Sequence, residues 1–129
     1  LAHRLQQLKQ QKLVAQNQQQ TVQKQQLAED LEQALNNKQW LTAKMLIDQL
    51  ASWATEDETT AKQLSDAQAL LQRQVKKLVD LGQYHYTRSQ LNQAIDYWQQ
   101  AQALAPHDND LNSRLQRAKT FRSNVEKLQ

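Results

Sequence analysis

Cysteine is absent from this sequence of 129 residues, and glycine and proline occur once each. The absence of cysteine excludes disulfides, thiolate metal ligands and a cysteine nucleophile. With one glycine and one proline, the chain has almost no residues that favour tight turns or β-hairpins. Leu, Ala, Gln, Lys and Glu dominate instead, and all five suit helices. The composition therefore predicts an all-α fold.

Long apolar runs are also missing. No stretch approaches the roughly 18 apolar residues of a transmembrane helix, and the first residues lack the charged-then-apolar order of a signal peptide. Because the chain starts with Leu1 and not with Met, we expect it to be part of a longer protein. The membrane is then an expected partner only through a missing anchor. A Cys-free chain with a stalk-like start favours the periplasmic side of a bacterial envelope.

Charge is unevenly distributed along the chain, whose net charge is +3. Residues 1–26 carry four bases and no acid, residues 27–110 carry seven bases and twelve acids, and residues 111–129 carry five bases and one acid. Basic ends therefore flank an acidic middle, and either end can attract an acidic partner.

Residues 1–26 contain eleven of the 26 glutamines. Their apolar residues recur at a three- and four-residue spacing, but Lys12 and Gln19 occupy two positions where a heptad seam needs apolar side chains. Two interpretations follow. The segment is either a solvated Gln-rich helix that leads into the domain, or a weak coiled coil through which the chain forms a homo-oligomer.

The apolar pattern becomes clearer after residue 26. Leu31 and Ala34 mark one face of a helix that should end near residues 36–38, where Asn37 can cap the next helix. That next helix has apolar residues from Trp40 to Ala54. Because the connection is so short, the two helices should form an antiparallel hairpin.

Three further helices are expected. Thr55 and Glu58 suit a capping box at the start of a third helix, which should extend over about residues 57–87. Ser89 is the expected cap of a fourth helix that ends before Pro106.

The fifth helix should start at a cap formed by Asn109 or Asp110. Its expected apolar face consists of Leu111, Leu115, Ala118, Phe121, Val125 and Leu128.

Residues 75–108 place small and large side chains at regular stations on two of these helices. The stations hold Leu78, Leu81, Gly82, Ala94, Trp98, Ala101 and Pro106. Small residues let helix axes approach closely, and Trp98 is large enough to fill the space between hairpins. This pattern resembles one tetratricopeptide repeat, a helix-turn-helix of about 34 residues. His85 stands where the family usually has Tyr.

A degenerate second copy of the pattern is present at residues 24–57. Its matching stations are Leu27, Ala34, Ala43, Ile47 and Leu50. Leu31 replaces the glycine and Thr55 replaces the proline. Residues 58–74 separate the two copies and lengthen the third helix. We therefore expect a Gln-rich helix over 1–26, and a tetratricopeptide-like stack of antiparallel hairpins over 27–129 with helix 109–128 as its solvating cap.

The resemblance implies a concave groove built from the first helices of the hairpins. The groove-facing stations are Lys76, Val79, Gln83, Tyr86, Asp110, Ser113 and Arg117. Their spacing puts each set on one helical stripe, although the same residues can also be simply exposed. Tyr86 and Arg117 are of types that often dominate binding energy. The family's carboxylate-clamp pattern needs Lys and Asn where Val79 and Gln83 stand, so a peptide C-terminus is not the expected ligand.

Catalysis, metal binding and cofactor binding are not expected. The three histidines, His3, His85 and His107, lie far apart and have no regular spacing to other ligands. Residues 108–110 lack the glycine and the terminal Glu of a calcium loop, and there is no Gly-rich phosphate loop. The chain is therefore not expected to be an enzyme or to bind a small-molecule substrate.

The expected function is a non-catalytic scaffold that binds another protein or a peptide, as part of a bacterial envelope assembly. The alternative is a structural coiled-coil spacer that oligomerises through residues 1–26. A nucleic-acid-binding helical domain is less favoured, because the basic face with Arg114, Arg117 and Arg122 lacks interleaved aromatic residues. No nucleic acid is expected as a partner.

Overall fold

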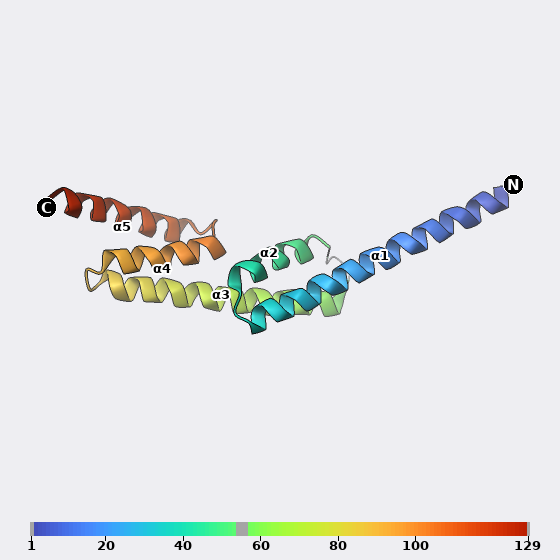
Figure 1. Cartoon of the computed structure of the whole chain (residues 1–129), viewed down its shortest axis with the longest axis horizontal. Coiled ribbons are helices and arrows are strands. Elements are labelled where there is room, and N and C mark those ends of the chain that lie inside the picture. Colours follow the sequence, from blue (N-terminus) through green and yellow to red (C-terminus); the bar gives the residue numbers. More distant parts are fainter. Residues whose placement is uncertain (1, 54–56, 129) are drawn as a thin grey trace. The chain divides into compact units, whose positions relative to one another are not determined.

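The structure is a computed structural model that describes residues 2–53 and 57–128, with the side chains of residues 5–11, 20–53 and 57–128. Within these residues the chain forms five helices and no strand (Figure 1). They are α1 (Ala2–Asn36), α2 (Trp40–Ala51), α3 (Glu58–Tyr86), α4 (Leu91–Leu104) and α5 (Asn109–Leu128). The predicted all-α fold is confirmed. None of the described helices is long and apolar enough to cross a membrane.

The chain forms two compact units, unit 1 up to Ser65 and unit 2 from Asp66 onward. The boundary lies within α3, so unit 1 contains α1, α2 and the start of α3, and unit 2 contains the rest of α3 with α4 and α5. Residue 26, after which we placed the domain boundary, lies inside α1, which continues to Asn36.

Unit 1 is built on a hairpin of α1 and α2 (Figure 1). Its fully buried apolar side chains on these helices are Leu31, Ala34, Ala43, Ile47 and Leu50. The side chains of residues 5–11 and 20–23 are exposed, and Figure 1 shows α1 extending well beyond the end of α2. Because exposed side chains bury little apolar area, this part of α1 adds little to the hydrophobic stabilisation.

Unit 2 consists of two successive helix pairs, α3 with α4 and α4 with α5 (Figure 1). Trp98 of α4 is only 2% exposed, and its Nε1 donates a hydrogen bond to the Val79 carbonyl of α3 at 3.1 Å. Gly82 faces the indole so closely that a Cβ atom at this position would overlap the ring. From α5, Leu115 and Ala118 are buried, and Gln102 of α4 donates a hydrogen bond across the pair to Asn112 at 2.8 Å. Small residues and one large one therefore determine how closely the helices pack.

The α1–α2 and α3–α4 hairpins turn in the same way. In the first turn Lys38 has a φ of 57°, and the N–H of Gln39 donates to the carbonyl five residues earlier at 2.8 Å. In the second turn Ser89 has a φ of 60°, and the N–H of Gln90 donates to the carbonyl five residues earlier at 2.9 Å. Ser89 follows Lys38 by 51 positions, the same interval that separates residues 24–57 from residues 75–108, where the sequence predicts two copies of one pattern. The two hairpins thus share one turn conformation.

The buried positions follow the same interval. Ala43, Ile47 and Leu50 of the first hairpin correspond to Ala94, Trp98 and Ala101 of the second, and all six are buried. Leu31 corresponds to Gly82. The first hairpin therefore has Leu and Ile where the second has Gly and Trp, so a smaller residue on one helix is matched by a larger one on the other.

The predicted caps of α2 and α4 are wrong. The N-cap residues are Gln39 and Gln90, and neither makes a side-chain capping hydrogen bond. Asn37 and Ser89 do not cap, because the residue directly before each N-cap, Lys38 or Ser89, has the left-handed conformation that reverses the chain.

The predicted cap of α5 is also wrong, since Asp108 takes this role instead of Asn109 or Asp110. The Oδ1 atom of Asp108 accepts a hydrogen bond from the N–H of Leu111 at 3.1 Å. The predicted capping box at the start of α3 cannot be assessed, because Thr55 lies outside the described residues.

The apolar face predicted for α5 is buried only in its first half. Leu111, Leu115 and Ala118 are buried, whereas Phe121 is 49% exposed and Leu128 is 88% exposed. Arg122 still contacts the first turn of α4, because its Nη1 donates a hydrogen bond to Oδ1 of Asn92 at 3.2 Å. Helix α5 has 20 residues and α4 has 14, so the turns of α5 after Arg122 extend past the start of α4.

Candidate interaction surfaces

The four α3 residues of the predicted groove share a stripe but differ in exposure. Lys76 and Gln83 are exposed, Val79 is half-buried, and Tyr86 is 37% exposed. The Tyr86 ring lies 5.5 Å from the Trp98 ring, centroid to centroid, and the Val79 carbonyl accepts the Trp98 hydrogen bond. Tyr86 therefore takes part in helix packing and also presents an exposed edge.

The three α5 residues of the predicted groove, Asp110, Ser113 and Arg117, are all exposed. Asp110 pairs with Arg114 one turn later, at 3.4 Å between Oδ2 and Nη2. No hydrogen bond, ion pair or ring contact among the described residues joins the α5 set to the α3 set. The structure thus presents two separate polar stripes, and α4 packs against both of the helices that bear them.

A groove that we did not predict lies on the other flank of α3 in unit 2. It has a volume of about 510 Å³ and is lined by Arg73, Lys76, Lys77, Asp80, Leu81 and Tyr84. Only Lys76 belongs to the predicted set. The repeat pattern assigns Leu81 to the core, so the sequence did not predict an exposed binding surface on this face. The signal that could have revealed it is the four-residue spacing of Arg73, Lys77 and Leu81.

An aromatic cluster occupies the end of α3 and the start of α4. The His85 ring stacks on Tyr97 at 5.3 Å between centroids and meets Tyr84 edge-on at 5.2 Å. His85 Nδ1 lies within hydrogen-bond distance of Oε1 of Gln90, at 2.6 Å. The guanidinium of Arg88 lies 3.5 Å from the centre of the Tyr84 ring. His85 therefore bridges the two helices.

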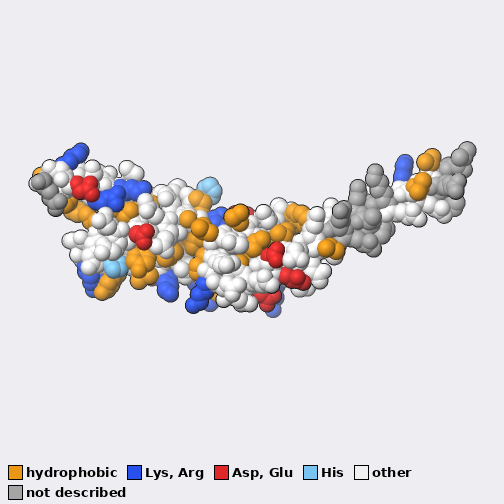
Figure 2. Space-filling model, viewed as in Figure 1, with side chains coloured by type: hydrophobic (Ala, Val, Ile, Leu, Met, Phe, Trp, Pro, Cys, Tyr) orange, Lys and Arg blue, Asp and Glu red, His pale blue; other side chains and the backbone are white. Residues whose placement is uncertain are grey.

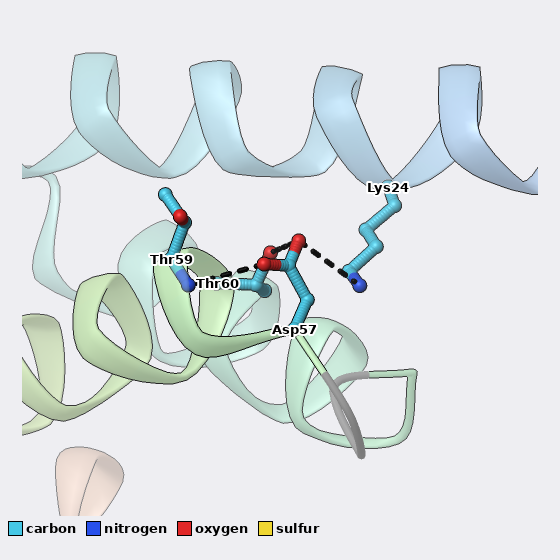
Figure 3. Close-up of polar contacts among 4 residues, drawn as sticks. All are labelled: Lys24, Asp57, Thr59 and Thr60. Atoms are coloured by element: carbon cyan, nitrogen blue, oxygen red, sulfur yellow. Dashed lines mark hydrogen bonds and ion pairs between the residues drawn. The ribbon is translucent and has the colours of Figure 1, made fainter.

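The start of α3 is stabilised by Asp57 (Figure 3). Its Oδ2 accepts the Thr60 hydroxyl at 2.8 Å, its Oδ1 accepts the Thr59 N–H at 3.1 Å, and Lys24 of α1 lies 3.6 Å away. The Thr60 hydroxyl, then the Thr59 N–H, and less strongly Lys24, lower the pKa of Asp57 below its ordinary value of 3.8. A lowered folded-state pKa means that the carboxylate stabilises the fold above about pH 3.8 and loses this effect as the pH falls further. The Thr59 contact caps α3, and the ion pair with Lys24 links the start of α3 to α1, so these contacts have a structural role.

A hollow of about 550 Å³ in unit 1 offers little to a ligand. Its lining consists of Gln20, Thr21, Gln23, Lys24, Ser52 and Trp53. Trp53 is the one large apolar side chain among these residues and is 37% exposed. Lys24 already pairs with Asp57 at 3.6 Å. This lining supplies hydrogen-bonding groups without the apolar contacts that usually bind a ligand.

No group of three or more His, Asp or Glu side chains suited to a metal ion is found within the described part of the chain. Comparison of the chain with models of protein families, with curated proteins and with solved structures found no match. Function must therefore be inferred from the surfaces themselves.

Proposed function

We propose that the chain is a non-catalytic interaction module of the tetratricopeptide type, which binds a partner protein or peptide through the stripes of α3 and α5. The observation that carries this proposal is the repeated hairpin: the same turn and the same buried positions recur after 51 residues, from Lys38 to Ser89. A module built by repeating one hairpin buries one side of each helix against its neighbours and leaves another side for partners.

The packing of unit 2 supports the resemblance at most of the helical positions that carry it. Leu78, Gly82, Ala94, Trp98 and Ala101 are buried, whereas Leu81 is only half-buried. Helix α4 ends at Leu104, two residues before Pro106. Small buried residues beside Trp98, which let two helices approach closely, are what the resemblance predicts.

The exposed members of the stripes are the residues available to a partner. Lys76, Gln83 and Arg117 are exposed, and no described acid lies within ion-pair distance of Lys76 or Arg117. A partner can therefore bind these cations without breaking an existing ion pair. Tyr86 and Arg117 are the two expected anchors. A substitution of Arg117 tests partner binding without disturbing the packing, whereas Tyr86 also contacts Trp98.

The test is a pair of charge-matched double variants. Gln83→Glu with Arg117→Glu should reduce capture of the native partner from an extract by roughly tenfold, which corresponds to about 1.4 kcal/mol. Gln93→Glu with Lys127→Glu makes the same charge change at exposed positions outside the stripes and should leave capture intact. Both variants should keep a near wild-type melting temperature, since exposed substitutions cost within about 0.5 kcal/mol. Full capture by the stripe variant would refute this surface.

A second candidate function is a structural spacer that oligomerises through α1. The observation that favours it is the exposure of Leu5, Leu8 and Val22, at 60%, 59% and 64%. A spacer of this kind would sediment as a concentration-dependent oligomer, and deletion of residues 1–22 would convert it to a monomer. An interaction module does not need to form an oligomer.

A further inference from the structure

The flank of α3 that faces away from α4 in unit 2 carries a row of accessible apolar side chains. Leu70 is 40% exposed, Tyr84 is 51% exposed, and Leu81 between them is half-buried. Residues 11 and 14 positions apart return to nearly the same side of a helix, so the three side chains share one face. The row spans about 21 Å, which is four helical turns. This is the length of contact that a short helix makes.

Unpaired positive charges lie beside this row. The groove along it contains three bases, Arg73, Lys76 and Lys77, and one acid, Asp80. None of the three bases forms an ion pair or a hydrogen bond with another described side chain. Figure 2 shows Lys and Arg side chains in blue along the edge of unit 2 where α3 runs, beside apolar side chains in orange. The groove is shallow and lined by α3 alone, and it combines apolar side chains with unpaired bases.

The exposed aromatic ring at one end of the groove is held in place. Arg88 lies over the Tyr84 ring at 3.5 Å from its centre, and its Nη1 donates a hydrogen bond to the Tyr84 carbonyl at 2.9 Å. Ordering of this side chain before binding lowers the entropic cost of a contact. Tyr84 is thus a suitable anchor for an apolar side chain of a ligand.

We propose that this groove, which we call the α3 groove, binds an amphipathic acidic helix of a partner protein. Its apolar row fits the apolar stripe of a helix of about four turns, with anchors spaced by three and four residues. Its unpaired bases fit Asp and Glu residues beside that stripe, and forming these pairs breaks no ion pair in the chain. The inference rests on the proposed function as a protein-binding module, but it concerns a different flank of α3, which meets the predicted stripe at Lys76.

The experiment uses the full chain and a labelled helical peptide of about 18 residues with Leu along one stripe and Glu beside it, followed by fluorescence anisotropy. We expect saturable binding that weakens at least about tenfold in Arg73→Glu with Lys77→Glu. The control, Lys119→Glu with Lys127→Glu, makes the same change of net charge on α5 and should shift the affinity by no more than roughly twofold. Tyr84→Ala should also weaken binding while the helical circular dichroism stays unchanged.

Three results would overturn the proposal. The peptide fails to bind, both double variants weaken binding equally, or a peptide with Lys in place of Glu binds as well. A second copy of the chain is the competing occupant, and sedimentation would reveal it as a dimer that Arg73→Glu with Lys77→Glu dissociates. Lys76 is left unchanged because it borders both surfaces. If the Gln83 and Arg117 double variant loses partner capture but the peptide does not bind to the α3 groove, this inference is refuted. The proposed function would then still stand.

Discussion

Gly82→Leu should destabilise the α3–α4 hairpin by at least about 3 kcal/mol, the upper end of the usual cost of overpacking. A Cβ atom at this position already overlaps the indole of Trp98, and that ring is 2% exposed and cannot swing into solvent. The better helix propensity of Leu opposes this cost by less than about 1 kcal/mol. Urea unfolding followed by circular dichroism measures the net change.

The first hairpin supplies the compensating change. It has Leu31 where the second hairpin has Gly82, and Ile47 where the second has Trp98. Adding Trp98→Ile to Gly82→Leu copies the first pair into the second hairpin, and we expect it to recover at least about half of the lost stability, because contacting residues couple by about 0.5–3 kcal/mol. A double variant no more stable than Gly82→Leu alone would show that the two hairpins do not share one packing scheme.

Leu31→Ala should cost about 2–5 kcal/mol, the range for deleting a large aliphatic side chain from a core. Leu31 is 0% exposed in the α1–α2 hairpin, whereas Val22 on the same helix is 64% exposed. The matched control Val22→Ala should therefore stay within about 0.5 kcal/mol of wild type. Both values come from the same urea titration.

The contrast between these two variants tests where α1 begins to contribute to the fold. A large loss of stability for Val22→Ala would mean that the N-terminal part of α1 is buried in solution, as a coiled coil through this segment requires. Near-equal losses for Leu31→Ala and Val22→Ala would contradict the exposure of Val22 that the structure shows.

The helices and hairpins could be predicted from the sequence because apolar spacing marks the side of each helix that packs against its hairpin partner. Leu31, Ile47 and Trp98 all lie where their spacing placed them, and all are buried. The shortage of glycine and proline left few ways to interrupt α1 and α3. These are properties of neighbouring residues, and a sequence records them directly.

The caps could not be predicted because a cap depends on backbone dihedral angles as well as on residue type. Asn37 and Ser89 have side chains that suit a cap, but the left-handed residues Lys38 and Ser89 shift the start of each helix to a glutamine. At α5 the choice among three neighbouring polar residues was decided by the position of one N–H group, which Asp108 reaches.

The α3 groove was missed for a different reason. The repeat signature treats Leu81 as a core residue, but in unit 2 its side chain is only half-buried and lines an open groove. Whether an apolar residue is covered depends on which element packs on that flank, and periodicity carries no information on this. Phe121 is a second case, since it is 49% exposed although the neighbouring Arg122 contacts Asn92 of α4.

The most direct test of a protein-binding role for the stripes is photo-crosslinking from single positions in living cells. A benzophenone amino acid replaces Gln83 or Ser113 on the stripes, and Gln49 or Gln93 at exposed control positions. We expect adducts with the same protein from both stripe positions and none from the two controls. Equal yields from all four positions, or no adduct from either stripe position, would contradict the proposed function.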